Sequence, residues 1–363
     1  MIPYVIVFII ITFGLTYAAP RYNSCGLSRQ YAGILTIIVG CVYILFSSMK
    51  DFDAYYFMND MSAYEMYFNQ AGCSLGTYFR TSIFEPGYVV FSWAFYRLFG
   101  NYRLFLIVLY LLIFACFVYF IKNIEWRKNR FLTLAAIIIL LFSSMYLLRM
   151  GIAIGFGLVM IIKLSQGKKN VALFFLLIGI SFHYSAMILL PAYVFTFVFG
   201  GKVKIGKWVT IFLVLITFGF TYIASSCLVT YMAGSSKYYV YKNTGSIGIP
   251  GVVVLLFILI LSFYKYSEII GKPKCQVHAI ITISLFANAL VIPLQLQYGI
   301  MYRMNLFFLP MQYVALEYLR NTYSKTVMKY VIGIVSVVYF VYRIYALFSV
   351  EIEYLGLPYK LIF

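Results

Sequence analysis

Acidic side chains are the scarcest charged groups in this sequence. Of 363 residues only ten are Asp or Glu, against 28 Lys or Arg, and charged residues together make up 10% of the chain. That shortage excludes an ordinary soluble globular protein, in which about a quarter of the residues are charged. The chain is instead 64% hydrophobic, with a mean hydropathy of +0.94. These values indicate a polytopic membrane protein.

Other missing features exclude further classes. The six cysteines show no paired spacing, so neither a disulfide framework nor a zinc site is expected. The net charge of +18 is spread over short clusters between apolar runs, and without a basic surface domain nucleic-acid binding is not expected. No internal repeat and no appended soluble domain is visible. We therefore predict a single integral membrane domain over residues 1–363, with no cofactor and no metal.

Apolar runs recur along the whole chain. A membrane-crossing helix needs about 20 apolar residues, and fewer when it is short or partly re-entrant. By that rule the candidate spans are 2–19, 31–48, 103–121, 131–147, 150–163, 171–182, 184–199, 208–228, 250–266, 277–296, 304–319 and 329–348. The sequence thus predicts an all-α polytopic fold with about twelve transmembrane helices.

The distribution of Lys and Arg predicts the orientation, because cytoplasmic loops carry an excess of both. With the N-terminus outside and residues 50–102 as one long external loop, eighteen of the 28 basic residues face the cytoplasm. Residues 86–99 then form an interfacial helix along the outer surface, anchored at headgroup level by Tyr88, Trp93 and Phe95. The cytoplasmic loops are 20–30, 122–130, 163–170, 200–208, 265–276 and 320–329.

Half of the acidic residues lie in one polar stretch of the predicted external loop. This topology also brings Arg149, His183 and Arg303 to the external face, although they are distant in sequence. Convergence of these groups on one leaflet is what a site for a lipid-linked substrate requires. The acidic residues concerned are Asp51, Asp53, Asp60, Glu65 and Glu85.

Arg149, Arg303 and His183 are the candidate ligands of a phosphate or diphosphate. Each interrupts or begins an apolar run, where an unpaired charge is costly, and the planar guanidinium of arginine suits bidentate binding of phosphate. The alternative reading of each arginine is a turn residue that snorkels to the interface. For His183 two further readings are open. It is a structural residue that forms hydrogen bonds, or it takes part in proton transfer.

Two carboxylates are candidates for a general base. Pro86 and Gly87 follow Glu85 directly and fix a turn that holds its carboxylate near the membrane. Desolvation there is expected to make the carboxylate more basic than in water. Asp51 is the second candidate. Its D-x-D spacing with Asp53 is shared with metal sites of nucleotide-sugar transferases, but a two-residue spacing carries little information and no metal is expected.

Aromatic side chains are frequent in the polar stretch, within residues 54–67. Such rings commonly stack on sugars, and amphipathic anchoring explains them equally well. The predicted glycan contacts are Asp53, Tyr55, Tyr56, Tyr88, Tyr184 and Tyr302.

Five short blocks together resemble the EpsG family of bacterial exopolysaccharide polymerases, which is related to Wzy-type capsule and O-antigen polymerases. Two positions depart from the family pattern: Lys50 stands where the family often has Arg, and Met150 replaces the usual Gln. The resemblance implies a fold similar to the GT-C membrane glycosyltransferases. The blocks are Lys50-Asp51-Phe52 with Tyr55 and Tyr56, Phe84-Glu85-Pro86-Gly87-Tyr88, Leu148-Arg149-Met150-Gly151-Ile152-Ala153, Phe182-His183-Tyr184-Ser185-Ala186 and Tyr302-Arg303.

The residues and the resemblance together predict a polymerase that joins polyprenyl-diphosphate-linked oligosaccharide repeat units at the outer face of the bacterial cytoplasmic membrane. Its partners are the lipid-linked substrate, the bilayer and, as a further candidate, a chain-length regulator. An O-antigen ligase-like transferase, a lipid-linked oligosaccharide flippase and a membrane O-acyltransferase are the alternatives.

Overall fold

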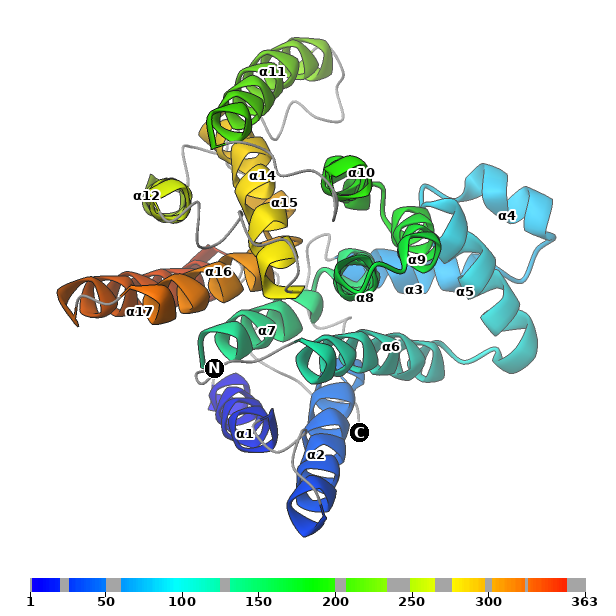
Figure 1. Cartoon of the computed structure of the whole chain (residues 1–363). Coiled ribbons are helices and arrows are strands. Elements are labelled where there is room, and N and C mark those ends of the chain that lie inside the picture. The colour runs from blue at the N-terminus through cyan, green and yellow to red at the C-terminus, as the bar shows by residue number, and fades with distance from the viewer. Residues whose placement is uncertain are drawn as a thin grey trace. The chain divides into compact units, whose positions relative to one another are not determined.

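The computed structural model describes residues 2–19, 26–49, 60–124, 131–199, 207–233, 249–264, 276–297, 302–323 and 326–350, and within these ranges every regular element is a helix (Figure 1). The predicted all-α class is therefore confirmed for this part of the chain. Four predicted site residues, Asp51, Asp53, Tyr55 and Tyr56, lie outside it. The chain divides into two compact units, of which the first comprises Met1–Lys163, Asn170–Met187 and Arg343–Phe363 and the second Leu164–Lys169 and Ile188–Tyr342.

The first unit contains the helices from α1 to α9, apart from the residues around the α8–α9 turn. Helix α1 packs against α2 and α7, and α6 packs against α2, α3, α5 and α7. A 3₁₀ helix, Tyr184–Leu189, follows α9. The helices are α1 (Ile2–Ala18), α2 (Leu27–Ser48), α3 (Asp60–Gln70), α4 (Leu75–Thr81), α5 (Pro86–Phe99), α6 (Tyr102–Asn123), α7 (Phe131–Ser144), α8 (Leu148–Ser165) and α9 (Lys169–Phe182).

The second unit is arranged around α14, which packs against α10, α11, α12, α15 and α16. Its helices are α10 (Leu190–Phe199), α11 (Lys207–Ala233), α12 (Ile249–Tyr264), α14 (Gln276–Gln297), α15 (Tyr302–Asn305), α16 (Leu309–Thr322) and α17 (Thr326–Val350), the last of which continues into the first unit at Arg343.

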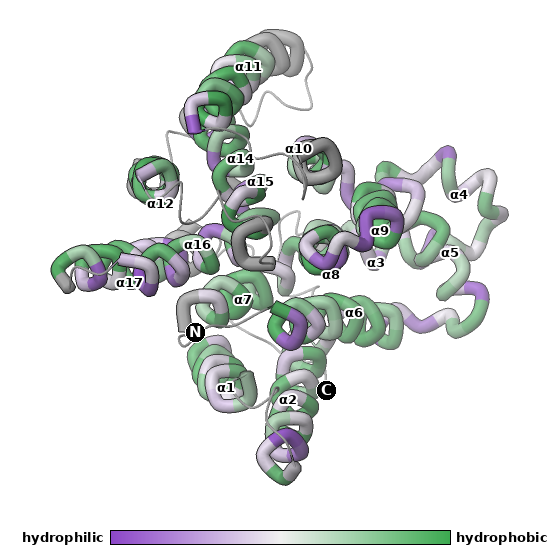
Figure 2. The backbone as a smooth tube through the Cα atoms, in the orientation of Figure 1, coloured by the Kyte–Doolittle hydropathy of each residue, from purple (hydrophilic) through white to green (hydrophobic). Residues whose placement is uncertain are grey.

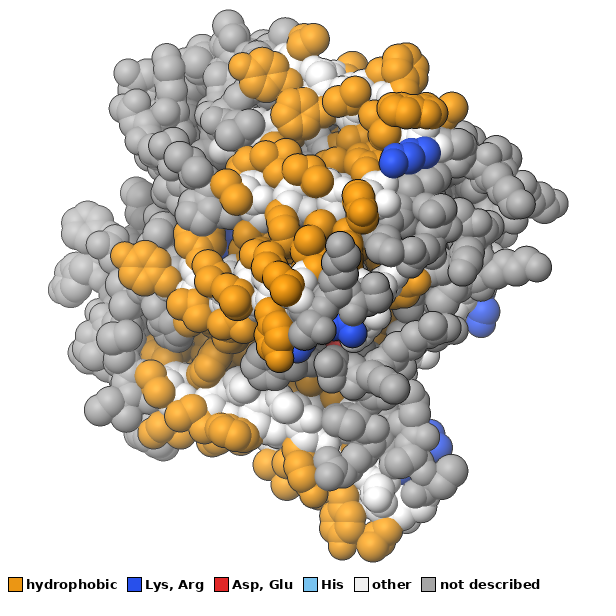
Figure 3. Space-filling view, turned by 60° about the vertical axis from the view of Figure 1, so that its left-hand side comes forward, with side chains coloured by type: hydrophobic (Ala, Val, Ile, Leu, Met, Phe, Trp, Pro, Cys, Tyr) orange, Lys and Arg blue, Asp and Glu red, His pale blue; other side chains and the backbone are white. Residues whose placement is uncertain are grey.

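Each of the twelve predicted spans overlaps a helix, and five described helical segments are long and apolar enough to cross a membrane. Six further apolar helical segments have 10–17 residues whose side chains the structure describes. Hydrophobic residues fill long stretches of α1, α6 and α7 (Figure 2), and the described side chains on the face in Figure 3 are mostly hydrophobic. These features are those of a membrane protein. The five long segments are Leu27–Ser48, Tyr102–Asn123, Leu148–Ser165, Lys207–Ala224 and Val327–Tyr345.

The predicted external loop contains three helices, α3, α4 and α5. Helix α5 has the predicted bounds, because Pro86 begins it at the first helical position and Gly100, with φ of +61°, ends it in the left-handed region. Ser74 and Asn101 cap α4 and α6 by accepting hydrogen bonds from the backbone N–H groups three residues on.

Two of the three predicted headgroup anchors on α5 face the protein instead. Tyr88 is 1% exposed and Phe95 is 8% exposed. Both rings pack against Phe105 of α6, so they stabilise the contact between α5 and α6 and do not reach lipid headgroups. Trp93 is partly buried, and its Nε1 donates to the backbone oxygen of Cys73 at 3.1 Å. The prediction failed for Tyr88 and Phe95 because α5 has neighbours on the side where they lie.

The two predicted breaks in the apolar runs are present. Residue His183 lies between the end of α9 and the 3₁₀ helix. The other break covers residues 145–147, so that Arg149 lies in the first turn of α8 rather than in the break itself. Both breaks place a polar side chain at the end of a helix.

Candidate active site

The carboxylate of Glu85 is the centre of a polar cluster in the first unit. Glu85 is the N-cap residue of α5, with φ of −68° and ψ of 151°, yet its side chain does not cap that helix. The side chain therefore extends away from α5 and is free to bond to other elements.

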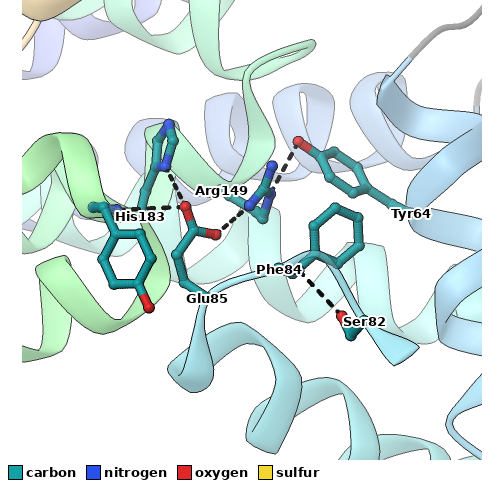
Figure 4. A network of polar contacts seen from close by, with 7 residues as sticks. Tyr64, Ser82, Phe84, Glu85, Arg149 and His183 are labelled. Carbon is teal, nitrogen blue, oxygen red and sulfur yellow. Dashed lines mark hydrogen bonds and ion pairs between the residues drawn. The ribbon is translucent and has the colours of Figure 1, made fainter. Parts of the chain in front are cut away.

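Three groups from two other segments bind this carboxylate (Figure 4). Arg149 of α8 donates from Nη1 to Oε2. On the other side, Oε1 lies 2.7 Å from Nδ1 of His183 and accepts a longer bond, 3.4 Å, from the backbone N–H of Tyr184. The structure thus brings together Glu85, Arg149 and His183, three of the residues that the sequence singled out.

Glycines allow the three segments to come this close. A Cβ atom on Gly87 of α5 would lie 2.3 Å from Oγ of Ser181 and 2.8 Å from its backbone oxygen, so α5 touches the end of α9 directly. A Cβ on Gly151 of α8 would lie 2.4 Å from Cβ of Ser144 on α7, and one on Gly155 would lie 3.0 Å from Cβ of Cys116 on α6. For Gly151 and Gly155 these contacts allow close packing of α8 against α7 and α6.

Aromatic rings enclose the guanidinium of Arg149. Its Cζ atom lies 4.3 Å from the ring centre of Phe84, 5.4 Å from that of Tyr64 and 6.0 Å from that of Tyr88. Its Nε donates to the hydroxyl of Tyr64 at 3.3 Å. Cations are attracted to the faces of such rings, more strongly where water is excluded, so the rings and Glu85 together compensate the charge of Arg149.

The surroundings of Glu85 lower its pKa below the ordinary value. Burial of the carboxyl raises the pKa and is the largest single effect, but the hydrogen bond from His183 and the charge of Arg149 together outweigh it. The expectation that Glu85 would be more basic than a carboxylate in water was therefore wrong. Burial was foreseen, whereas the two partners that stabilise the charged form come from distant parts of the chain.

His183 and Tyr184 are the more exposed members of the cluster. The side chain of Glu85 is 7% exposed, that of Arg149 18% and that of His183 29%, while Tyr184 is 53% exposed. Within the described ranges, Nε2 of His183 has no hydrogen-bond partner. A ligand therefore reaches the imidazole more easily than the carboxylate behind it.

The remaining predicted site residues are placed differently. Tyr88 is buried in the aromatic cluster, which overturns its predicted direct contact with a glycan. Arg303 lies on α15 of the second unit, where its Nε is buried and unpaired with any described group. The side chain of Tyr302, like Asp51, Asp53, Tyr55 and Tyr56, lies outside the described part of the chain.

Sequence reasoning missed two contributors to the site. Tyr64 was seen only as part of an aromatic stretch, and Ser181, which Gly87 contacts, carried no signal at all. The spacing of Tyr64 within α3 gave no hint that its hydroxyl would meet an arginine 85 residues away. Among the described residues no group of three or more His, Cys, Asp or Glu side chains is arranged to hold a metal ion.

Comparison with known proteins adds the family. Neither a curated protein nor a solved structure matches the chain at a significant level. The sequence profile of the EpsG family matches residues 36–361, nearly the whole chain, including Glu85, Arg149 and His183. The apolar helices of the chain agree with the membrane location of proteins in this family. The chain belongs to the EpsG family of Wzy-type exopolysaccharide polymerases.

Proposed function

We propose that this protein joins polyprenyl-diphosphate-linked oligosaccharide repeat units into a polysaccharide at the outer face of the bacterial cytoplasmic membrane. The growing glycan on its lipid diphosphate is the donor, and a sugar hydroxyl of the next repeat unit is the acceptor. The observation that carries this proposal is the cluster of Glu85, Arg149 and His183 in a chain of the EpsG family.

Arg149, His183 and Arg303 are the groups proposed to hold the departing diphosphate, on which negative charge accumulates in the transition state. Arg149 engages Tyr64 through Nε and Glu85 through Nη1, so among the described contacts its Nη2 is left for a phosphate oxygen. Arg303 has a buried, unpaired Nε. In this proposal it is a further cation for the diphosphate.

Acceptor activation requires a group that takes the proton of the attacking hydroxyl. Glu85 and His183 supply a carboxylate and an imidazole in contact, and Asp51 remains a further candidate. The exposed Tyr184 is proposed to contact the glycan, together with Asp53, Tyr55, Tyr56 and Tyr302. Energy comes from the diphosphate linkage, so no nucleotide or cofactor is required.

The membrane arrangement belongs to the same proposal. The twelve spans are proposed from the apolar runs, and the GT-C-like fold from the resemblance to the family. The external segment 50–102 and a site at the outer leaflet are proposed from the distribution of Lys and Arg. Single cysteines at Leu98, which is 74% exposed, and at Lys168 in the α8–α9 turn should react with membrane-impermeant reagents from opposite sides. Labelling of both from the same side would contradict the orientation.

The decisive experiment is polymerisation by the purified protein in nanodiscs, with polyprenyl-diphosphate repeat units as the substrate. Wild-type protein should produce a ladder of lengthened glycans, and Ala variants of Glu85, Arg149, His183 or Arg303 should not, while still inserting into membranes. Lys168→Ala removes an exposed cation in the α8–α9 turn, on the proposed cytoplasmic side, and should leave the ladder unchanged. Full-length polymer from the Arg149 and Arg303 variants would remove the proposed role in leaving-group stabilisation.

A further inference from the structure

Glu85 is poorly placed to meet a substrate hydroxyl itself. Its side chain is 7% exposed, Oε2 is engaged by Arg149, and Oε1 is engaged by both His183 and the backbone of Tyr184. A general base must come within hydrogen-bond reach of the proton that it abstracts. A carboxylate covered on both oxygens meets that requirement only if its partners move away.

The imidazole of His183 is placed better. The ionised Glu85 carboxylate only accepts hydrogen bonds, so the 2.7 Å contact with Oε1 requires the proton on Nδ1. In the neutral imidazole Nε2 is then the unprotonated nitrogen, and Figure 4 shows it pointing away from Glu85. The imidazole is 29% exposed, and none of the described residues occupies Nε2.

We propose that Nε2 of His183 is the general base of the polymerase reaction and that Glu85 is its positioning residue. This inference rests on the proposed function, and it leaves the diphosphate to Arg149 and Arg303, because an unprotonated Nε2 cannot donate a hydrogen bond to an anion. Glu85 holds the imidazole in the required tautomer and orientation and stabilises the imidazolium ion that forms, the relationship seen between carboxylate and histidine in hydrolase triads. Arg149 holds the same carboxylate from its other oxygen.

The proposed reaction is a substitution at the anomeric carbon of the donor. The acceptor hydroxyl gives its proton to Nε2 as its oxygen bonds to the anomeric carbon of the donor. The bond between that carbon and the phosphate oxygen breaks, and the electron pair leaves with the lipid diphosphate. His183 then carries a proton on each nitrogen and releases one to water, which restores the starting state.

One substitution at His183 distinguishes a general base from a residue that only supports Glu85. In His183→Asn the side-chain amide can replace Nδ1–H as the donor to Glu85, but no base remains at the position of Nε2. We expect thermal stability and binding of the lipid-linked donor to be kept, while the polymerisation rate falls about 10²-fold to 10⁴-fold, the usual contribution of general base catalysis. Retention of the wild-type rate by His183→Asn would overturn the proposal.

Glu85→Gln provides the complementary test, since its amide oxygen still accepts from Nδ1 while the negative charge is gone. The rate should fall, and the acidic limb of the rate-against-pH curve should move to lower pH, because the imidazolium loses its neighbouring carboxylate. The charged and titratable groups around His183 in the described cluster are Glu85, Arg149, Tyr64 and Tyr184. Of these, Glu85 alone loses its charge in this variant, although Arg149 also loses its acceptor because the amide NH2 faces Nη1. An unmoved acidic limb would contradict the pairing.

A chemical readout distinguishes failure of the pairing from failure of the proposed function. Diethyl pyrocarbonate modifies neutral imidazole, and the chain has only two histidines, so mass spectrometry can follow His183 with His278 as the internal reference. The pH midpoint for modification of His183 should be lower in Glu85→Gln than in the wild type, whereas that of His278 should not change. Equal His183 midpoints would overturn the pairing. A wild-type protein with the expected midpoints but no transfer to any lipid-linked acceptor would overturn the function and the base assignment, leaving the pairing intact.

Discussion

Gly87 and Ser181 touch so closely that no larger residue fits at position 87. A Cβ on Gly87 would lie 2.3 Å from Oγ of Ser181 and 2.8 Å from both its Cβ and its backbone oxygen. The contact lies two residues after Glu85 and two before His183. It therefore fixes the distance between the carboxylate and the imidazole.

Gly87→Ala should separate these two groups. Because the clash includes the backbone oxygen of Ser181, rotation of its side chain cannot relieve it, and overpacking of this kind costs about 1–3 kcal/mol. We expect a lower unfolding temperature in detergent and loss of most polymerase activity. Gly76→Ala in the neighbouring α4 is the matched control, since a Cβ there meets nothing within 4 Å. Equal behaviour of the two variants would contradict the importance of the contact.

Arg149→Lys should reduce activity although the positive charge remains. Lysine cannot reach the Tyr64 hydroxyl and the Glu85 carboxylate together in the fixed geometry of the guanidinium. Loss of one hydrogen bond to a charged group, about 1.5–3 kcal/mol, corresponds to a rate lowered roughly tenfold to a hundredfold. Arg97→Lys is the control, because exposed Arg97 makes a single described hydrogen bond, to the backbone of Cys73. The measurement is the rate of polymer formation by both variants at equal protein levels. Equal rates in Arg149→Lys and Arg97→Lys would contradict the prediction.

Tyr64 and Tyr88 both face Arg149 and should respond differently to loss of the hydroxyl. The Tyr64 hydroxyl accepts from Nε of Arg149 at 3.3 Å, whereas the Tyr88 hydroxyl is buried without a described partner. Tyr64→Phe should lower the polymerisation rate severalfold, and Tyr88→Phe should leave rate and stability unchanged or slightly raise stability. A strong loss of activity in Tyr88→Phe would support the direct contact between Tyr88 and the glycan, which the burial of Tyr88 argues against.

The ion pair of Glu85 predicts a pH dependence of stability. Because the pKa of Glu85 is lower in the folded protein than its ordinary value of 4.5, the unfolded chain binds more protons in that range and stability falls with decreasing pH. The difference in unfolding temperature between wild type and Glu85→Gln should be greatest above pH 4.5 and should shrink as the pH falls through the lowered pKa. A difference that grows on acidification would contradict the lowered pKa.

The second unit contains a buried amide network that should hold four helices together. Gln312 of α16 donates from Nε2 to side-chain oxygens of Asn288 on α14 and Asn305 on α15, and the Tyr339 hydroxyl of α17 accepts from Asn305 and donates to Gln312. All four residues are at most 1% exposed. Gln312→Leu leaves three polar partners short of a bond and should lower the free energy of unfolding by about 1–3 kcal/mol.

Thr217→Val is the control for this network, since the described hydrogen bond of the Thr217 hydroxyl is to the backbone of its own helix, at Leu213. It should change the unfolding temperature little. The network also fixes α15, a four-residue helix too short to be stable alone, on which Arg303 lies. A stable Gln312→Leu protein would show that packing alone positions this helix.

The sequence alone was sufficient to predict the helical class, the bounds of α5 and the break at His183. These features depend on local physics: long apolar runs, a proline at the first turn, a glycine in the left-handed region after the last. It also singled out Glu85, Arg149 and His183, because charged or titratable groups are conspicuous in a chain that has few of them. Selecting these residues as candidates does not require the distances between them.

Only the tertiary structure decided what those residues do to one another. Glu85 lies 64 residues from Arg149 and 98 from His183 in the chain, and no periodicity connects them. Their contact reversed the expected direction of the pKa of Glu85, and the packing of α5 on α6 turned Tyr88 and Phe95 inward, away from lipid. Both outcomes depend on which surfaces distant helices present to each other, and that information becomes visible only when the chain is folded.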